Sequence, residues 1–209
     1  MTAESAEIKK GRKFEQVLNG AREVFMRDGF EGASVDDIAK AAGVSKATLY
    51  SYVPDKRLLF SEVAKAECNR QADGAIAEID INAPAEVNLA AAARHLVGFF
   101  LSDFGTQVFR ICLSEAHRFP DLGKRFYQSG PAMVRERMIP VLRYYVDKGE
   151  LEIEDFELAV NQFAELCKSD LFVRKLCGLQ NDFAKADVDQ VIEGAVEMFV
   201  ARYGVRKTA

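Results

Sequence analysis

The chain has 209 residues, 49 % of them hydrophobic and 29 % charged, so it is long enough and apolar enough to bury a core of its own. This composition excludes a disordered segment, a collagen-like repeat and a small disulfide-stapled scaffold. The net charge of −4 argues at first against nucleic acid as a partner, but residues 1–60 carry ten Lys and Arg against nine Asp and Glu. Because distant charges are screened at moderate salt, a local cluster matters more than the sum. Such a cluster stands near the N-terminus: Lys9, Lys10, Arg12 and Lys13.

The first part of the chain predicts three helices. Apolar residues spaced by three and four run from Phe14 to Phe25, and Gly29 ends this first helix. Ser34 is an expected N-cap for a second helix, from Val35 to about Ala42. After the break at Gly43, Ser45 is an expected N-cap for a third helix, Lys46 to about Tyr52.

The rest of the chain predicts further helices and no sheet. Trp is absent, Pro occurs only five times and strong helix formers dominate. The expected helices span Lys56 to about Ile79, residues 85–104, Gly105 to about Arg118, two segments that begin at Pro120 and Pro131, then Glu154–Leu179 and Asp187–Tyr203. We therefore expect an all-α chain with three short helices in residues 1–55, followed by a larger helical body, residues 56–209.

The spacing of small residues around Gly43 is typical of a helix-turn-helix motif. Ala39 lies four residues before Gly43, which suits the close crossing of two helices and a turn with positive φ. A helical hairpin of no special function has the same spacing. The neighbouring residues favour DNA, because Lys46, Thr48 and Tyr50 face outward on the third helix, where they can approach bases and phosphates.

Residues 32–59, GASVDDIAKAAGVSKATLYSYVPDKRLL, closely resemble the DNA-binding signature of the TetR family of bacterial transcriptional regulators. The match covers residues 13–60, with Val53 where the family usually has Phe and Tyr52 where His is common. Residues 114–122, SEAHRFPDL, and Gly149-Glu150-Leu151 resemble the ligand-binding domain of an AefR-like subgroup over residues 100–170.

The resemblance implies an N-terminal three-helix helix-turn-helix domain, residues 1–55, followed by a larger helical ligand-binding and dimerisation domain, residues 56–209. It also implies the roles of the DNA-binding residues. It places Lys46, Ala47 and Thr48 nearest the bases or the adjoining phosphates. It assigns phosphate contacts to Tyr50, Tyr52 and Lys56, the last at the positive end of the following helix, while Ser34 caps its helix and approaches a phosphate. For the basic cluster at residues 9–13, a DNA-binding arm and an ordinary solvated helix start are equally supported.

The last two helices are the expected homodimer interface. One helix-turn-helix reads only a few base pairs, so two protomers on two half-sites are expected. Two apolar sets, from Leu158 to Leu176 and from Val188 to Val200, exceed what packing within one chain requires, and in the family these helices form an intersubunit four-helix bundle.

The candidate ligand residues in the body are His95, Phe99, Glu115 and Phe163, in a possible apolar cavity for a small-molecule effector. A single His or a Phe stripe at helical spacing is more often part of a core, so this assignment competes with simple packing. Two histidines 22 residues apart and no clustered thiols predict no metal site, and we expect no cofactor.

Cellular context follows from what the chain contains. No signal-peptide stretch or membrane-spanning run is found, which predicts a cytoplasmic protein with no membrane partner. We expect Cys68, Cys112, Cys167 and Cys177 to be reduced thiols packed as small hydrophobes; a redox switch is the alternative.

The predicted function is a homodimeric repressor that binds operator DNA and is released by a small-molecule effector. An activator, a regulator without a ligand, and a helical small-molecule- or partner-binding protein with a vestigial helix-turn-helix are the alternatives. No catalytic motif is recognisable, so no enzyme is predicted.

Overall fold

The computed structural model describes residues 11–205, apart from the side chain of Arg12. Its first helices are α1 (Arg12–Gly32), α2 (Val35–Ala41), α3 (Lys46–Tyr52) and α4 (Lys56–Ala77). The body continues with α5 (Ala85–Leu101), α6 (Asp103–Glu115), α7 (Pro120–Tyr127), the π-turn η1 (Gln128–Ala132), α8 (Met133–Asp147), α9 (Phe156–Leu176) and α10 (Lys185–Tyr203). The only extended pairing among residues 11–205 is one isolated antiparallel bridge, Leu151 with Gly204. The predicted all-α class is confirmed.

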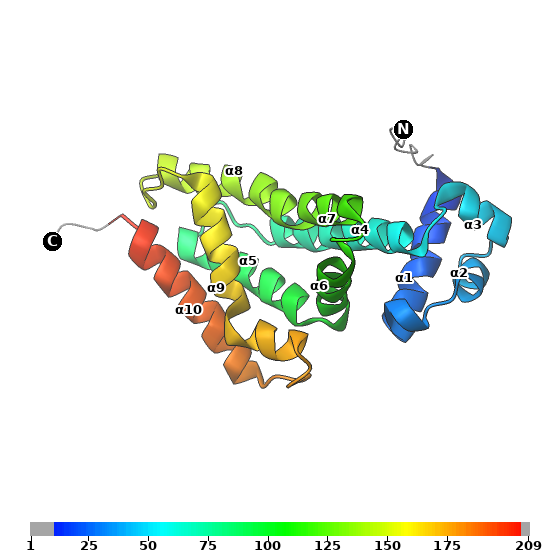
Figure 1. Ribbon diagram of the computed structural model, residues 1–209. Coiled ribbons are helices and arrows are strands. Elements are labelled where there is room, and N and C mark those ends of the chain that lie inside the picture. The colour runs from blue at the N-terminus through cyan, green and yellow to red at the C-terminus, as the bar shows by residue number, and fades with distance from the viewer. Residues whose placement is uncertain (1–10, 206–209) are drawn as a thin grey trace.

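Two lobes share the long helix α4 (Figure 1). Helices α1–α3 form the smaller lobe, and α4 runs from it into the body, where α9 and α10 lie side by side. The core of the small lobe contains the first half of α4, through Leu59, Phe60 and Val63, and also Phe104 and Val108 of α6. A division at residue 55 therefore cuts through a shared core, and α4 and α6 belong to both parts.

The predicted caps in the small lobe are confirmed. Ser34 accepts a hydrogen bond from the backbone N–H of Asp37 at 3.0 Å, and Ser45 accepts one from that of Thr48 at 3.1 Å. Asp55 caps α4 by accepting from the backbone N–H of Arg57 at 2.7 Å. The helix boundaries expected around these caps hold because a cap is a local interaction.

Several boundaries in the body differ from those expected: α6 ends at Glu115 rather than about Arg118, α9 spans Phe156–Leu176 rather than Glu154–Leu179, and α10 begins at Lys185 rather than Asp187. Helix α5 ends at Leu101, since Ser102 accepts from Gly105 N–H at 2.9 Å and caps α6 two residues earlier than predicted. Pro131 does not begin a helix; it lies inside η1, and α7, η1 and α8 run on without a break. A π-turn tolerates the missing N–H of a proline. The Ser129 hydroxyl of η1 donates to the carbonyl oxygen of Arg125 in α7.

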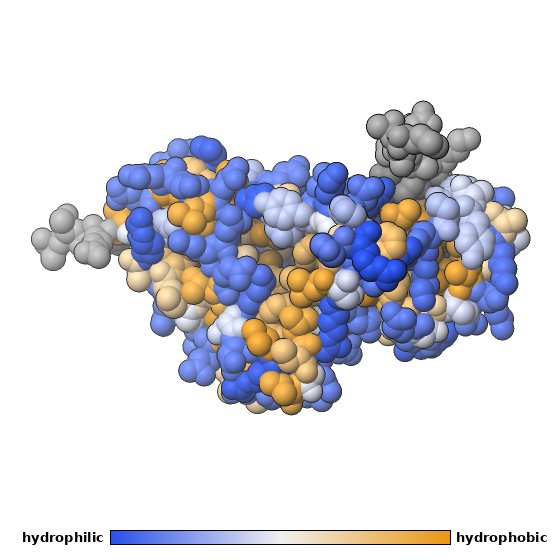
Figure 2. All heavy atoms as spheres, in the orientation of Figure 1, coloured by the Kyte–Doolittle hydropathy of each residue, from blue (hydrophilic) through white to orange (hydrophobic). Residues whose placement is uncertain are grey.

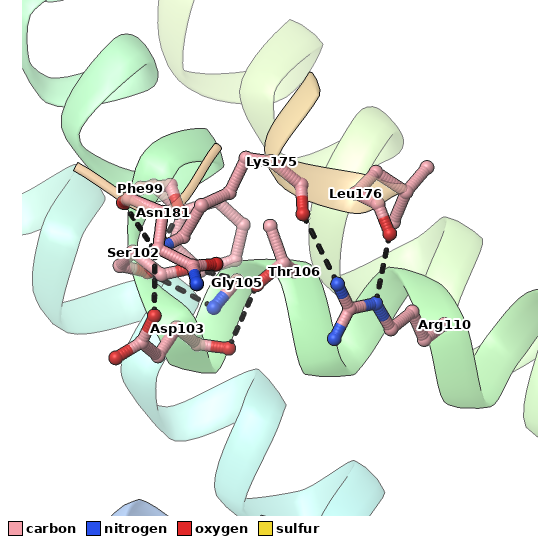
Figure 3. Close-up of polar contacts among 9 residues, drawn as sticks. All are labelled: Phe99, Ser102, Asp103, Gly105, Thr106, Arg110, Lys175, Leu176 and Asn181. Atoms are coloured by element: carbon pink, nitrogen blue, oxygen red, sulfur yellow. Dashed lines mark hydrogen bonds and ion pairs between the residues drawn. The ribbon is translucent and has the colours of Figure 1, made fainter. Parts of the chain in front are cut away.

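Helix α9 is interrupted at Ser169, where a continuous helix was expected. Ser169 has φ +42° and ψ −153°, a conformation that L-residues rarely adopt. Figure 3 shows how the segment after this break is held against α6: the Arg110 guanidinium donates to the carbonyl oxygens of Lys175 and Leu176 at 3.0 and 2.9 Å. The Lys175 ammonium pairs with Asp103 at 2.7 Å. These contacts join residues more than sixty positions apart, so helical periodicity could not predict them.

Three of the four thiols are buried as expected. Burial raises the pKa of Cys68, Cys112 and Cys167 to about 12 each, so these thiols stay protonated and unreactive at neutral pH. Cys177 departs from the expectation, because it follows the last turn of α9 and is exposed.

Candidate functional sites

Helices α2 and α3 form a compact helix-turn-helix. Gly43 turns the chain with φ +63°, in the left-handed region that favours glycine. Ile38, Leu49 and Val53 are fully buried beneath the motif. The predicted need for a small residue at Ala39 is matched by its burial, but the tightest approach is elsewhere: a Cβ added to Gly20 of α1 would lie 2.4 Å from the backbone nitrogen of Ala42.

One face of α3 is free for a partner. Lys46, Ala47, Tyr50 and Ser51 are all exposed, at the spacing that places residues on one side of a helix. The Lys46 ammonium pairs with Asp36 of α2 at 2.5 Å, but both side chains are mostly exposed, so a phosphate can compete for the lysine. Tyr50 is 48 % exposed, so its ring and hydroxyl are accessible to a partner.

The other predicted DNA contacts are partly engaged within the chain. The hydroxyls of Thr48 and Ser45 share a hydrogen bond of 2.8 Å, and the Ser34 hydroxyl donates to the Asp37 carboxylate at 2.5 Å. Tyr52 is half-buried, with its ring 5.9 Å from that of Phe14. Ser34, Thr48 and Tyr52 are each partly exposed, and Ser45 and Ser51 are exposed residues with hydroxyls that the predicted set did not include.

Lys56 has a different position from the one its predicted role requires. Its ammonium donates to the carbonyl oxygens of Phe30 and Ala33, at 2.8 and 3.1 Å, and lies 4.6 Å from the centroid of the Phe30 ring. The side chain is half-buried and ties the last turn of α1, and the connector that follows it, to the start of α4. Lys56 therefore has a structural role here that its position after a Pro turn did not reveal.

The predicted basic arm is described only at its last residue. Lys9 and Lys10 lie outside the described residues, as does the side chain of Arg12, and Lys13 is exposed on the first turn of α1.

The body contains a cavity of about 400 Å³, within the usual range of roughly 300–1,000 Å³ for small-molecule sites. Helices α4 to α9 and the π-turn form its walls, and apolar side chains line most of it. The aromatic lining residues are Phe99, Phe100, Phe109, Phe126, Tyr127 and Tyr145.

The cavity brings together two of the four predicted ligand residues. His95 and Phe99 line it, and the His95 Nε2 lies 3.0 Å from the Glu78 carboxylate on α4. Glu115 lies elsewhere: it ends α6 and faces Arg57 at 3.7 Å. Phe163 is fully buried in the core between α9 and α10, with its ring 5.2 Å from that of Phe199. A pattern at helical spacing does not distinguish a cavity wall from a packed core.

The same helices carry the small lobe and the cavity. The second half of α4, from Cys68 to Ala75, lines the cavity, while its first half packs in the core of the small lobe. On α6, Val108 belongs to that core and also lines the cavity. A molecule in the cavity thus touches the elements that support α1–α3.

Helices α9 and α10 expose apolar residues and a groove. Leu158 and Val173 of α9 are 48 % and 52 % exposed, and Met198 of α10 is 62 % exposed. A groove of about 630 Å³ runs between the two helices, lined by Leu166, Met198 and Phe199 among others. Figure 2 shows apolar surface gathered at the lower end of the body, over the last turns of α9 and the start of α10.

Neither a membrane segment nor a metal cluster stands out in residues 11–205. No single helix there is both long and apolar enough to cross a membrane, and α5 and α6 reach that composition only as a pair bent by 65°. The His, Cys, Asp and Glu side chains of the same residues form no group of three that could hold a metal ion.

Two family models match the chain. Residues 17–63 match the model described as bacterial regulatory proteins, tetR family. Residues 87–205 match the C-terminal domain of AefR-like transcriptional repressors.

Similar proteins agree with both matches. A putative TetR-family regulator from Mesorhizobium loti superposes with a TM-score of 0.79 at 26 % identity, over 95 % of this chain and 100 % of that one. The flavonoid-responsive regulator FrrA is 33 % identical, with a TM-score of 0.68 and the same two coverages. The repressor AcnR of Corynebacterium efficiens is 34 % identical over 59 residues, which are 28 % of this chain and 31 % of AcnR. The chain thus spans less than a third of the length of that curated relative.

Proposed function

The chain belongs to the TetR family of bacterial regulatory proteins, and from that premise we propose that it is a cytoplasmic homodimeric repressor. It binds operator DNA through α3 and leaves the operator when a small molecule enters the cavity of the body. The observation that carries the proposal is the sharing of α4 and α6 between the lobe that presents α3 and the wall of the cavity. The proposed role of the chain is binding of DNA and of a small molecule, not catalysis.

The exposed face of α3 is the proposed DNA-reading surface. Lys46 and Ala47 approach bases and adjoining phosphates first, with Thr48 at the edge of the face, and Tyr50 binds a phosphate through its hydroxyl. Ser34 and Tyr52 flank this face and add phosphate contacts. The Lys56 ammonium has three N–H groups and uses two of them on carbonyl oxygens. Its proposed phosphate contact is made by the third N–H group.

A second copy of the chain is the proposed occupant of the groove between α9 and α10. The apolar residues exposed there would be covered by the same helices of the partner, in a symmetric interface. Two helix-turn-helix motifs then face one side of the duplex, with half-sites separated by roughly one helical turn of 34–36 Å or a multiple of it.

Effector release follows from the shared helices. A ligand that fits the cavity better in one arrangement of α4 and α6 shifts the population towards that arrangement, and the distance between the two α3 helices changes with it. The name of FrrA, which describes it as flavonoid-responsive, supports a small-molecule effector for this chain as well.

The dimer is tested by Met198→Glu, which places a charge on the proposed interface. The wild-type chain should elute with the mass of two chains in light-scattering chromatography, and the variant with the mass of one. Leu113→Glu is the matched control, because Leu113 is 71 % exposed on α6, outside the groove. A monomeric wild type, or dissociation caused equally by both variants, would overturn the proposed interface.

DNA recognition is tested by selection from random duplexes. Selection by the wild-type chain should enrich a sequence with two related half-sites. Enrichment of no sequence would contradict the proposed repressor.

A further inference from the structure

The charged residues of the cavity lining are predominantly basic. Arg135, Arg137 and Lys168 contribute to the lining, against Glu165 as the single carboxylate. Arg137 pairs at 3.2 Å with Asp73, which does not line the cavity, so a molecule inside the cavity does not displace this partner. The electrostatic character of the cavity therefore depends on Arg135 and Lys168.

Arg135 has neutral partners. Its Nη2 donates to the Tyr127 hydroxyl at 3.0 Å and its Nη1 to the Asn161 side-chain oxygen at 3.3 Å. The guanidinium also lies 5.2 Å from the centroid of the Tyr127 ring. Within the described part of the chain Arg135 makes no ion pair, so its positive charge is not compensated.

Lys168 is held in an apolar environment with one exposed counter-charge. Its side chain is only 21 % exposed, and its ammonium lies 5.5, 5.6 and 5.9 Å from the ring centroids of Phe100, Phe109 and Phe172. The carboxylate of Glu165 pairs with it at 2.5 Å, but Glu165 is 69 % exposed. Because the Glu165 carboxylate is mostly solvated in the single chain, a ligand can replace it at Lys168 at small cost, and the freed carboxylate stays at the groove between α9 and α10 that it also lines.

Arg135 and Lys168 both lie at one face of α9. Asn161, Glu165 and Lys168 follow one another at spacings of four and three, so they share a face, and all three line the cavity. Arg135 reaches this face from α8 through Asn161. The two positive groups thus flank a strip of α9 about two turns long, roughly 10 Å.

We propose that the effector is an apolar organic acid, whose hydrocarbon body fills the cavity and whose carboxylate replaces Glu165 at the Lys168 ammonium, while the Arg135 guanidinium at the other end of the strip adds to the positive potential. Charge-assisted hydrogen bonds from a guanidinium and an ammonium are about twice as strong as neutral ones, and more so where water is excluded. This inference rests on the proposed function, since it specifies the chemistry of the molecule that enters the same cavity. A neutral ligand of equal shape would forgo the charge-assisted bond to Lys168 and the attraction of Arg135.

The test compares acids with neutral molecules of the same skeleton. The probes are dodecanoate against dodecanol, and naphthoate against naphthalenemethanol, with dissociation constants from calorimetry and melting temperatures as a second readout. The acid of at least one pair should bind about tenfold tighter than its neutral counterpart, as expected for a charge-assisted contact. The double variant Arg135→Gln, Lys168→Gln should abolish that preference.

The control variant, Arg94→Gln with Arg143→Gln, also removes two positive charges, but from residues of α5 and α8 that do not line the cavity. It should keep the preference for the acid. Equal or tighter binding of the neutral probes to the wild-type chain overturns the inference and leaves the small-molecule effector standing. Failure of all four probes to bind or to raise the melting temperature overturns both the organic acid and the apolar effector cavity. Selection of operator DNA, which needs no effector, tests the repressor separately from either result.

Discussion

Arg125 of α7 donates a hydrogen bond of 2.6 Å from its Nη1 to the Oε1 of Glu62 on α4. The Glu62 side chain is only 10 % exposed and Arg125 is 34 % exposed. Glu62 lies on the half of α4 that packs in the core of the small lobe, whereas Arg125 precedes Phe126, which lines the cavity. The pair is therefore a direct polar connection between the DNA-binding lobe and the cavity wall.

Replacing Arg125 should destabilise the fold through its partner. In Arg125→Met the Glu62 carboxylate stays buried without a counter-charge, and the free energy of unfolding should fall by about 2–3 kcal/mol. Glu62→Gln together with Arg125→Met should recover part of that loss. Urea denaturation of the two single variants and the double variant measures the coupling. Additive effects would mean that the pair makes no energetic connection.

Because α1 lies close to the turn after α2, adding a single methyl group at Gly20 should lower the free energy of unfolding. In Gly20→Ala the new methyl group would meet the Ala42 backbone at 2.4 Å, so the motif must shift. We expect a loss of about 1–3 kcal/mol in the free energy of unfolding, together with weaker DNA binding.

Gly98→Ala is the matched control. Gly98 lies on α5 with nothing within 4 Å of an added Cβ. There the substitution should stabilise the helix by about 0.5–1 kcal/mol. The same sign of change at both glycines would disprove the argument from close packing.

The Glu67 carboxylate of α4 should make the stability of the fold depend on pH. Burial tends to raise the pKa of this carboxyl, but hydrogen bonds from Arg70, Arg22 and Gln71 outweigh it and hold the pKa below its ordinary value of 4.5. A depressed pKa means that the contribution to stability is present above pH 4.5 and is lost as the pH falls through the folded-state pKa. Glu67→Gln should therefore cost about 1–2 kcal/mol at pH 7.

The comparison of wild type with Glu67→Gln by thermal unfolding across pH provides the check. The difference between them should shrink below pH 4.5. A difference that is constant from neutral to acid pH would show that the ionised carboxylate is not what stabilises α4.

The exposed residues of α3 predict two separable effects on DNA binding. Lys46→Gln should weaken binding to all duplexes similarly and reduce the slope of log affinity against log salt by about one, because one phosphate contact is lost. Thr48→Ala should change the preference among sequences and leave the salt slope unaltered. Fluorescence anisotropy at several salt concentrations measures both. Lys185→Gln, which removes a charge from α10, is the control, and an equal change of slope there would refute the assignment of Lys46.

Local signals in the sequence predicted the small lobe almost completely. The caps at Ser34 and Ser45 and the turn at Gly43 each depend on residues within a few positions, and the structure has them where the spacing placed them. Two features of this lobe differ from the expectation. Helix α1 continues to Gly32 past a kink at Gly29 (φ +71°), where its end was expected. The Lys56 ammonium binds carbonyl oxygens 26 and 23 positions away.

The body was less predictable because its details depend on distant partners. The break at Ser169 is accompanied by contacts of the following segment with Arg110, and no pattern within α9 indicates it. The apolar period on α5 correctly placed His95 and Phe99, but the same kind of period placed Phe163 in a cavity that it does not line. Which apolar face borders empty space is decided only when all helices are packed.

The central claim is that two chains read one operator through α3. The most direct measurement titrates the purified protein into the duplex enriched by selection and into a scrambled duplex of equal length, at two salt concentrations. The account predicts preferential binding to the enriched duplex, two protomers per site, and an affinity that falls steeply with salt. Equal and weak binding to both duplexes would contradict it.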